Sequence, residues 1–155
     1  MRITTAIVFT LLALTVAGCQ STGGDGASPQ SIVEATAAAN DGCTRLTLHC
    51  VQEDGSTKVC ASTAKERIGT ASDPEDLRAM KSGETVVLDE GEAVDVTVPI
   101  VQTDGKWTTV CGVTLERAGQ TKEMSIERAK TIAEAVKASL GDCCPNCSST
   151  SASSK

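Results

Sequence analysis

Cysteines are the residues of this chain most able to do chemistry. The sequence of 155 residues contains eight, and the densest group is the segment CCPNC, with thiols at Cys143, Cys144 and Cys147. Cys144 and Cys147 have the spacing of redox-active pairs, but they follow the expected end of a helix, where the dipole disfavours a thiolate. These thiolates could instead bind a soft metal ion, with His49 as a further ligand. A four-ligand zinc site normally shows two close pairs, and only one is present.

The N-terminal residues indicate where these thiols act. Arg2 precedes an apolar run from Ile3 to Gly18, which ends in small residues before Cys19. This run is too short to span a bilayer comfortably and is typical of a cleaved export segment. Together these residues resemble a bacterial lipoprotein signal sequence, the alternative being an ordinary signal peptide followed by a stray cysteine. The resemblance implies that Cys19 becomes the acylated N-terminus, with palmitate-type chains that anchor the protein to the cell envelope, facing the periplasm. Gln20, by resemblance to the enterobacterial sorting pattern, favours the outer membrane.

An exported domain with a small core is where disulfides form and matter, each contributing about 2–4 kcal/mol. Without Cys19, seven cysteines are candidates, an odd number that leaves at least one thiol unpaired. The candidates are Cys43, Cys50, Cys60, Cys111, Cys143, Cys144 and Cys147. Cys43, just after the first expected helix, could join that helix to the C-terminal cluster. Structural disulfides are the favoured interpretation, and metal binding or redox sensing is the alternative.

Composition excludes several classes of function. The net charge of −6 argues against nucleic-acid binding, which requires clustered Lys and Arg. Trp107 is the only aromatic ring after the signal besides His49, so stacking platforms and aromatic cages are excluded. With one histidine and neither a G-x-S-x-G nor an H-E-x-x-H motif, the sequence predicts no enzyme and no cofactor.

The rest of the chain predicts one small domain. We expect a signal peptide over 1–18, a flexible tether over 19–30, a folded domain over 31–141 and a Cys-rich motif with a Ser-rich tail over 142–155. Caps, prolines, glycine stops and apolar periodicity predict the individual elements. The expected helices are 29–39, 74–81 and 121–140, and the expected strands are 45–50, 57–63, 85–88, 93–102 and 107–116.

This order of elements predicts an α+β domain, a five-stranded antiparallel sheet with helices against one face. Residues 66–113 resemble extracytoplasmic Cache domains, which are relatives of the PAS fold. The segments that carry this resemblance are Arg67-Ile68-Gly69, Ser72 to Asp76 and the strand Asp95 to Pro99 before an Asp-Gly turn. The resemblance implies a small-molecule site between the sheet and its covering elements. It also implies that the first strand lies beside both its hairpin partner and the last strand, which would make Cys50, Cys60 and Cys111 neighbours. The ligand-binding candidates are Arg67, Arg78, Asp95 and Trp107.

Three functional hypotheses result. The first is a non-catalytic lipoprotein whose Cache-like sensor domain binds a small ligand or an envelope partner protein. The second is a thiol-rich metal-binding or redox-sensing module that uses Cys143, Cys144 and Cys147, with the sheet as scaffold. The third is a purely structural envelope adaptor.

Overall fold

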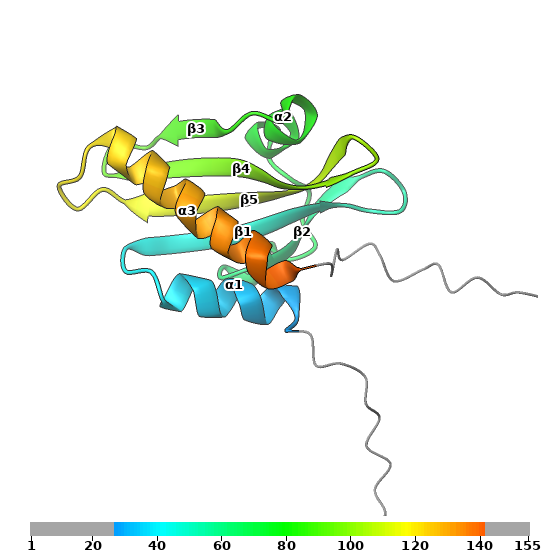
Figure 1. Cartoon of the computed structure of the whole chain (residues 1–155), viewed down its shortest axis with the longest axis horizontal. Helices are drawn as coiled ribbons and strands as arrows, with labels where there is room; N and C mark the ends of the chain where they lie inside the picture. The colour runs from blue at the N-terminus through cyan, green and yellow to red at the C-terminus, as the bar shows by residue number, and fades with distance from the viewer. Residues whose placement is uncertain (1–26, 142–155) are drawn as a thin grey trace, which may run out of the picture.

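A computed structural model describes residues 27–141 of the chain (Figure 1). The predictions for residues 1–26 and 142–155, including those for Cys19, Cys143, Cys144 and Cys147, lie outside the described residues. In chain order the elements are α1 (Pro29–Ala38), β1 (Cys43–Val51), β2 (Thr57–Ser62), the 3₁₀ segment η1 (Lys65–Arg67), α2 (Pro74–Ser82), β3 (Val86–Asp89), β4 (Ala93–Thr103), β5 (Lys106–Glu116) and α3 (Lys122–Leu140).

Local sequence signals set the helix boundaries. The Ser28 hydroxyl accepts a hydrogen bond from the Ser31 N–H and caps α1, and Thr121 caps α3 in the same way. In α2 the proline stands in the first turn, and Gly83, with φ 73°, ends the helix in the left-handed conformation. Because α1 begins at Pro29, the last two residues of the predicted tether belong to a helix.

The five strands form one antiparallel sheet in the order β2-β1-β5-β4-β3. β1 pairs with both β2 and β5, as the PAS-like arrangement implied, and the predicted fold class is confirmed. Pro99 lies within β4, although proline cannot donate a ladder hydrogen bond. It is tolerated because β3 pairs with β4 only from Thr97 back to Val94, so that β4 has no neighbour on that side at Pro99.

The two faces of the sheet differ in chemistry. Alternating residues of β1, β4 and β5 form an apolar face, which packs against α1 and α3 as Figure 1 shows. The fully buried members of this core include Leu46, Leu48, Val96, Val113, Ile132 and Val136. The alternate residues form the second face, called here the polar face because β1 contributes Arg45, Thr47 and His49 to it.

The prediction that the helices cover one face is wrong for α2. Ala79 and Met80 of α2 pack with Val86 and Val110 in a separate small apolar cluster on the polar face. α2 therefore lies opposite α1 and α3. The physical reason is that Val110 and Cys111 are adjacent in β5 and therefore point to opposite faces of the sheet. Cys111 is buried in the main core, so the apolar side chain of Val110 is buried on the other face by α2.

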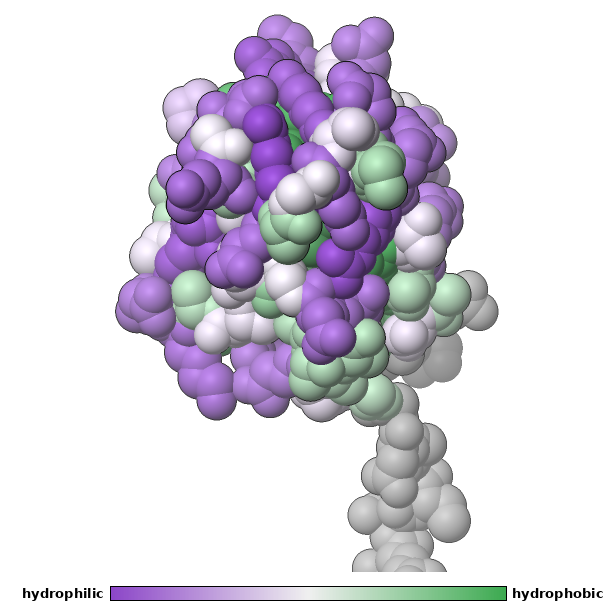
Figure 2. Space-filling view, turned by 90° about the vertical axis from the view of Figure 1, so that its left-hand side faces the viewer, coloured by the Kyte–Doolittle hydropathy of each residue, from purple (hydrophilic) through white to green (hydrophobic). Residues whose placement is uncertain are grey.

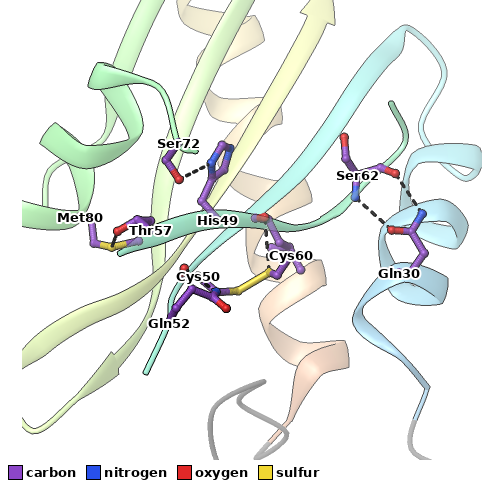
Figure 3. The surroundings of a disulfide bond; sticks show 10 residues. Gln30, His49, Cys50, Gln52, Thr57, Cys60, Ser62, Ser72 and Met80 are labelled. Carbon is purple, nitrogen blue, oxygen red and sulfur yellow. Dashed lines mark hydrogen bonds between the residues drawn. A yellow bond between two sulfur atoms is a disulfide. The ribbon is translucent and has the colours of Figure 1, made fainter. Parts of the chain in front are cut away.

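One disulfide joins two cysteines of the described residues. Cys50 of β1 is bonded to Cys60 of β2, with their Cα atoms 6.0 Å apart (Figure 3). Cys111 lies opposite Leu48 rather than Cys50, so the strand register keeps it out of this bond. Within residues 27–141, Cys43 and the buried Cys111 have free thiols.

None of the helices in residues 27–141 combines the length and the apolar character needed to cross a bilayer.

Candidate functional site

The polar face contains a small, partly open cavity above Gly112. Cross-strand pairing places Thr47 and Thr97 on either side of Gly112 in one row. The adjacent row contains Arg45, Thr114 and Asp95, from β1, β5 and β4. Since glycine has no side chain, the middle of the sheet is hollow at this point. The residues that line the cavity are Arg45, Thr47, His49, Arg67, Asp73, Glu75, Asp76, Asp95 and Gly112.

Two buried titratable side chains meet at one wall of the cavity. His49 of β1 and Asp76 of α2 are 2% and 4% exposed. The Nδ1 atom of His49 lies 3.3 Å from Oδ2 of Asp76 and 2.9 Å from the Ser72 hydroxyl, toward which Figure 3 shows the ring turned. Asp76 also accepts hydrogen bonds from the Thr97 hydroxyl and from the backbone N–H of Asp73. This network ties α2 to β1 and β4.

Burial moves the two pKa values toward the neutral forms. The pKa of His49 is lowered from 6.5 to about 4, mainly by burial and in part by the nearby positive charge of Arg67. Burial raises the pKa of Asp76 from 3.8 to about 6, although hydrogen bonds from Thr97 and Asp73 oppose the shift. At neutral pH Asp76 is therefore a carboxylate and His49 an uncharged imidazole.

These charge states assign the imidazole tautomer. A carboxylate only accepts hydrogen bonds and the Ser72 hydroxyl can accept one, so a proton on Nδ1 suits both of the contacts that this atom makes. The Nε2 atom then presents its lone pair. A Cβ atom placed on Gly112 would lie 3.9 Å from this Nε2, which puts the lone pair over the hollow of the sheet. Among residues 27–141 no hydrogen-bond donor reaches Nε2.

Two ion pairs border the cavity. Arg45 of β1 bonds Asp95 of β4 at 2.9 Å, across Thr114 of the strand between them. Arg67 of η1 bonds Asp73, the residue that precedes α2. In this closed arrangement the cavity measures about 10 Å³, which is room for about one water molecule. A larger ligand requires the cover formed by η1 and the start of α2 to move outward.

Of the four predicted ligand-binding residues, the structure places two in the cavity lining and two outside it. Arg67 and Asp95 line the cavity. Arg78 is exposed on α2 and is not part of the lining. Trp107 packs against Gly83 and borders a different hollow, of about 380 Å³, with Met80 and Leu77.

Sequence reasoning missed the centre of this site. The sequence suggested His49 only as a further ligand of a metal site, and Asp76 only as part of the segment Ser72 to Asp76 that resembles Cache domains. The one available signal was alternation. Arg45, Thr47 and His49 share a face of β1, and three hydrogen-bonding side chains in a row are a poor match for an apolar core.

The metal-binding alternative depends on thiols outside the described residues. Within residues 27–141 no group of three or more His, Cys, Asp and Glu side chains is arranged to hold a metal ion. Burial raises the pKa of both the Cys43 and the Cys111 thiols, which keeps them protonated at neutral pH.

Comparison with known proteins supports the fold. No family model matches the sequence, and no curated protein sequence matches it. Among solved structures, the chain is similar to the GAF domain of an Acinetobacter phosphoenolpyruvate-protein phosphotransferase, with TM-score 0.51, 16% identity and coverage of 73% of this chain and 80% of that one. A free methionine-R-sulfoxide reductase from Thermoplasma acidophilum (TM-score 0.47, 15% identity, coverage 69% and 88%) and the PixJ GAF domain from Thermosynechococcus elongatus (TM-score 0.47, 16% identity, coverage 72% and 84%) are more distant. The fold of this chain is GAF/PAS-like.

Proposed function

We propose that this chain is a cell-envelope lipoprotein whose domain binds a small polar molecule in the cavity above Gly112 and catalyses no reaction. The observation that carries the proposal is a partly open cavity with a charged, hydrogen-bonding lining, which includes the buried His49 and Asp76, on a sheet face that α2 covers. Buried polar groups stabilise a fold poorly compared with apolar ones, so a cluster of them in a cavity is typical of a binding site.

The two ion pairs of the lining suit a zwitterionic ligand, and the additional acidic side chains of Glu75 and Asp76 favour its ammonium group. Arg45 and Arg67 are bonded to Asp95 and Asp73 in the closed arrangement, so each ion pair offers one group for an anion and one for a cation. A molecule with a carboxylate and an ammonium group, such as a free amino acid, can replace these internal partners without leaving any of the four charges unpaired.

The absence of catalysis is proposed from the chemistry of the lining. With its pKa lowered to about 4, the His49 imidazole is a weak base at neutral pH. The lining contains neither a serine nor a cysteine that Nε2 could activate as a nucleophile. The envelope location is proposed from the sequence before Cys19.

A thermal-shift screen of amino acids, monocarboxylates and amines tests the proposal, with Gly112→Ala as the decisive variant. An alanine Cβ at this position meets its nearest neighbours at 3.9 Å, so the variant fits the fold while it fills the hollow. We expect a compound that raises the melting temperature of the wild type and has no effect on Gly112→Ala. Arg67→Met should also abolish the shift, whereas Arg78→Met, a matched change outside the cavity, should preserve it. A screen without any stabilising compound would contradict the proposal and favour a structural adaptor.

A further inference from the structure

A second hollow lies at the end of the sheet where β1 begins and β5 ends. It is an open groove of about 740 Å³, within the size range of ligand sites. Figure 2 looks onto this end of the molecule, where hydrophilic residues cover most of the surface. The groove is lined by Thr44, Arg45, Glu90, Glu92, Ala93, Thr114, Glu116, Arg117, Ala118 and Gly119. Arg45 belongs to both hollows, with its bond to Asp95 between them.

The groove is acidic once its internal ion pairs are counted. Asp95 balances the charge of Arg45, and Asp89 is shared by Arg117 and by Lys122, which lies 3.6 Å from its Oδ2 atom, so two cations meet one carboxylate there. The exposed carboxylates of Glu90, Glu92 and Glu116 have no ion-pair partner within residues 27–141. The groove therefore attracts positive groups.

Two polar groups of the lining lack partners. Thr114 is 6% exposed, and its hydroxyl oxygen has no hydrogen bond within the described part of the chain. The Nε–H of Arg117 is buried and likewise has no acceptor there. Buried polar groups are normally satisfied, so these two indicate a molecule that brings a hydrogen-bond acceptor as well as positive charge.

The walls of the groove are held by the main chain. The N–H of Arg117 donates to the carbonyl oxygen of Glu92 at 2.9 Å, which joins the end of β5 to the β3–β4 turn. The N–H of Glu116 donates to the carbonyl oxygen of Gly42 at 2.9 Å, which joins it to the loop before β1. The three carboxylates thus belong to a groove whose main-chain walls are preformed, which lowers the entropic cost of binding. The buried Thr114 hydroxyl and Arg117 Nε–H become accessible to a ligand when the arginine side chains beside them turn aside.

We propose that this groove binds an extended basic segment of a partner protein. Lysine or arginine side chains of the segment pair with Glu90, Glu92 and Glu116, and a main-chain carbonyl oxygen accepts the hydrogen bond from the Arg117 Nε–H. A free polyamine supplies the charge but not the acceptor, so the two buried polar groups favour a peptide. This site shares Arg45 with the cavity above Gly112 and is otherwise lined by different residues.

Fluorescence anisotropy with the purified full chain and a labelled, end-blocked Gly-Lys-Gly-Lys-Gly peptide tests the proposal at about 50 mM salt, where surface charges are weakly screened. The double change Glu92→Gln with Glu116→Gln should weaken binding about tenfold. Glu53→Gln, which removes an exposed carboxylate outside the groove lining, should change the affinity less than about twofold. Thr114→Val should weaken binding without lowering the melting temperature, and Gly112→Ala should leave binding unchanged.

Three results would overturn this inference. The first is an equal effect of Glu53→Gln and of the double change, which would show only a general attraction to an acidic protein. The second is equally tight binding of spermidine, which lacks a carbonyl group. The third is the same affinity for a peptide with both lysines replaced by norleucine.

Discussion

At the scale of single residues, His49 and Asp76 explain most of the chemistry of the polar face. Burial opposes charge on both, and their contact holds α2 against β1. The sequence could not identify this pair, because a lone histidine in a strand and an acid at a helix start are ordinary in their own positions. The two residues are 27 positions apart in sequence, and only the folded arrangement of α2 and β1 brings them into contact. Arg67 and Asp95 were predicted as ligand-binding residues from the Cache resemblance. Gly112 could not be predicted, because its contribution is the absence of a side chain beneath the cavity.

The pair predicts an uncommon pH dependence. The raised pKa of Asp76 makes its contribution to the free energy of unfolding fall as pH rises from about 4 to about 6. The lowered pKa of His49 makes its contribution rise between about pH 4 and 6.5. The two effects oppose each other in the wild type. We expect Asp76→Asn to gain stability as pH rises through this window and His49→Gln to lose it, as measured by urea unfolding at several pH values. Identical slopes for both variants would contradict the pair as described.

The hydroxyl of Thr114 predicts a stabilising substitution. Thr114→Val keeps the branched shape and removes a buried polar atom that has no partner within the described residues, so the free energy of unfolding should rise by about 1 kcal/mol. Thr97→Val is the matched control on the neighbouring strand. It removes the donor to Asp76 and should cost about 1–3 kcal/mol in urea unfolding. A loss of stability in Thr114→Val would mean that its hydroxyl is satisfied.

At the scale of elements, sequence signals predicted nearly every boundary. Ser28 and Thr121 as caps, Gly83 as a stop and the Asp-Gly turns each act locally, so they are readable without the fold. The face of the sheet against which α2 packs could not be predicted from such local signals. It depends on which face carries Val110, and therefore on the register of β5 against its neighbours.

Gly83, at the end of α2, packs against Trp107 of the β4–β5 hairpin. An alanine there would adopt a positive φ and would place its Cβ 2.2 Å from Nε1 of Trp107. We expect Gly83→Ala to cost about 3 kcal/mol, from left-handed strain plus displacement of the indole. Gly91→Ala has a similar φ with open space and should cost about 1–2 kcal/mol. Unfolding followed by the fluorescence of the single tryptophan measures both, and equal costs would show that Trp107 moves aside freely.

The Cys50–Cys60 disulfide closes the hairpin of β1 and β2, and its cysteines are separated by 10 in sequence. Replacing both cysteines with alanine should cost about 2–3 kcal/mol, because the unfolded chain regains the freedom of the closed loop. Reductant should destabilise the wild type by the same amount and leave the double variant unchanged. A further loss in the double variant on reduction would reveal a bridge made by other cysteines.

At the scale of the whole molecule, one sheet separates two kinds of interior. The apolar face, with α1 and α3, supplies the core that stabilises the fold, while the polar face, with α2 and η1, contains the cavity. Because the cover includes a 3₁₀ turn and the first turn of a short helix, opening it disturbs little of the main core. This division of roles fits the proposed function, in which ligand binding would change the cover and not the scaffold.

The single histidine makes the central claim directly measurable. In ¹⁵N spectra of the imidazole at pH 7, the account predicts a protonated Nδ1 and an unprotonated Nε2. A compound that raises the melting temperature should then shift the Nε2 resonance in the wild type and leave it unchanged in Gly112→Ala. A stabilising compound that leaves Nε2 unaffected in the wild type would contradict ligand binding in the cavity above Gly112.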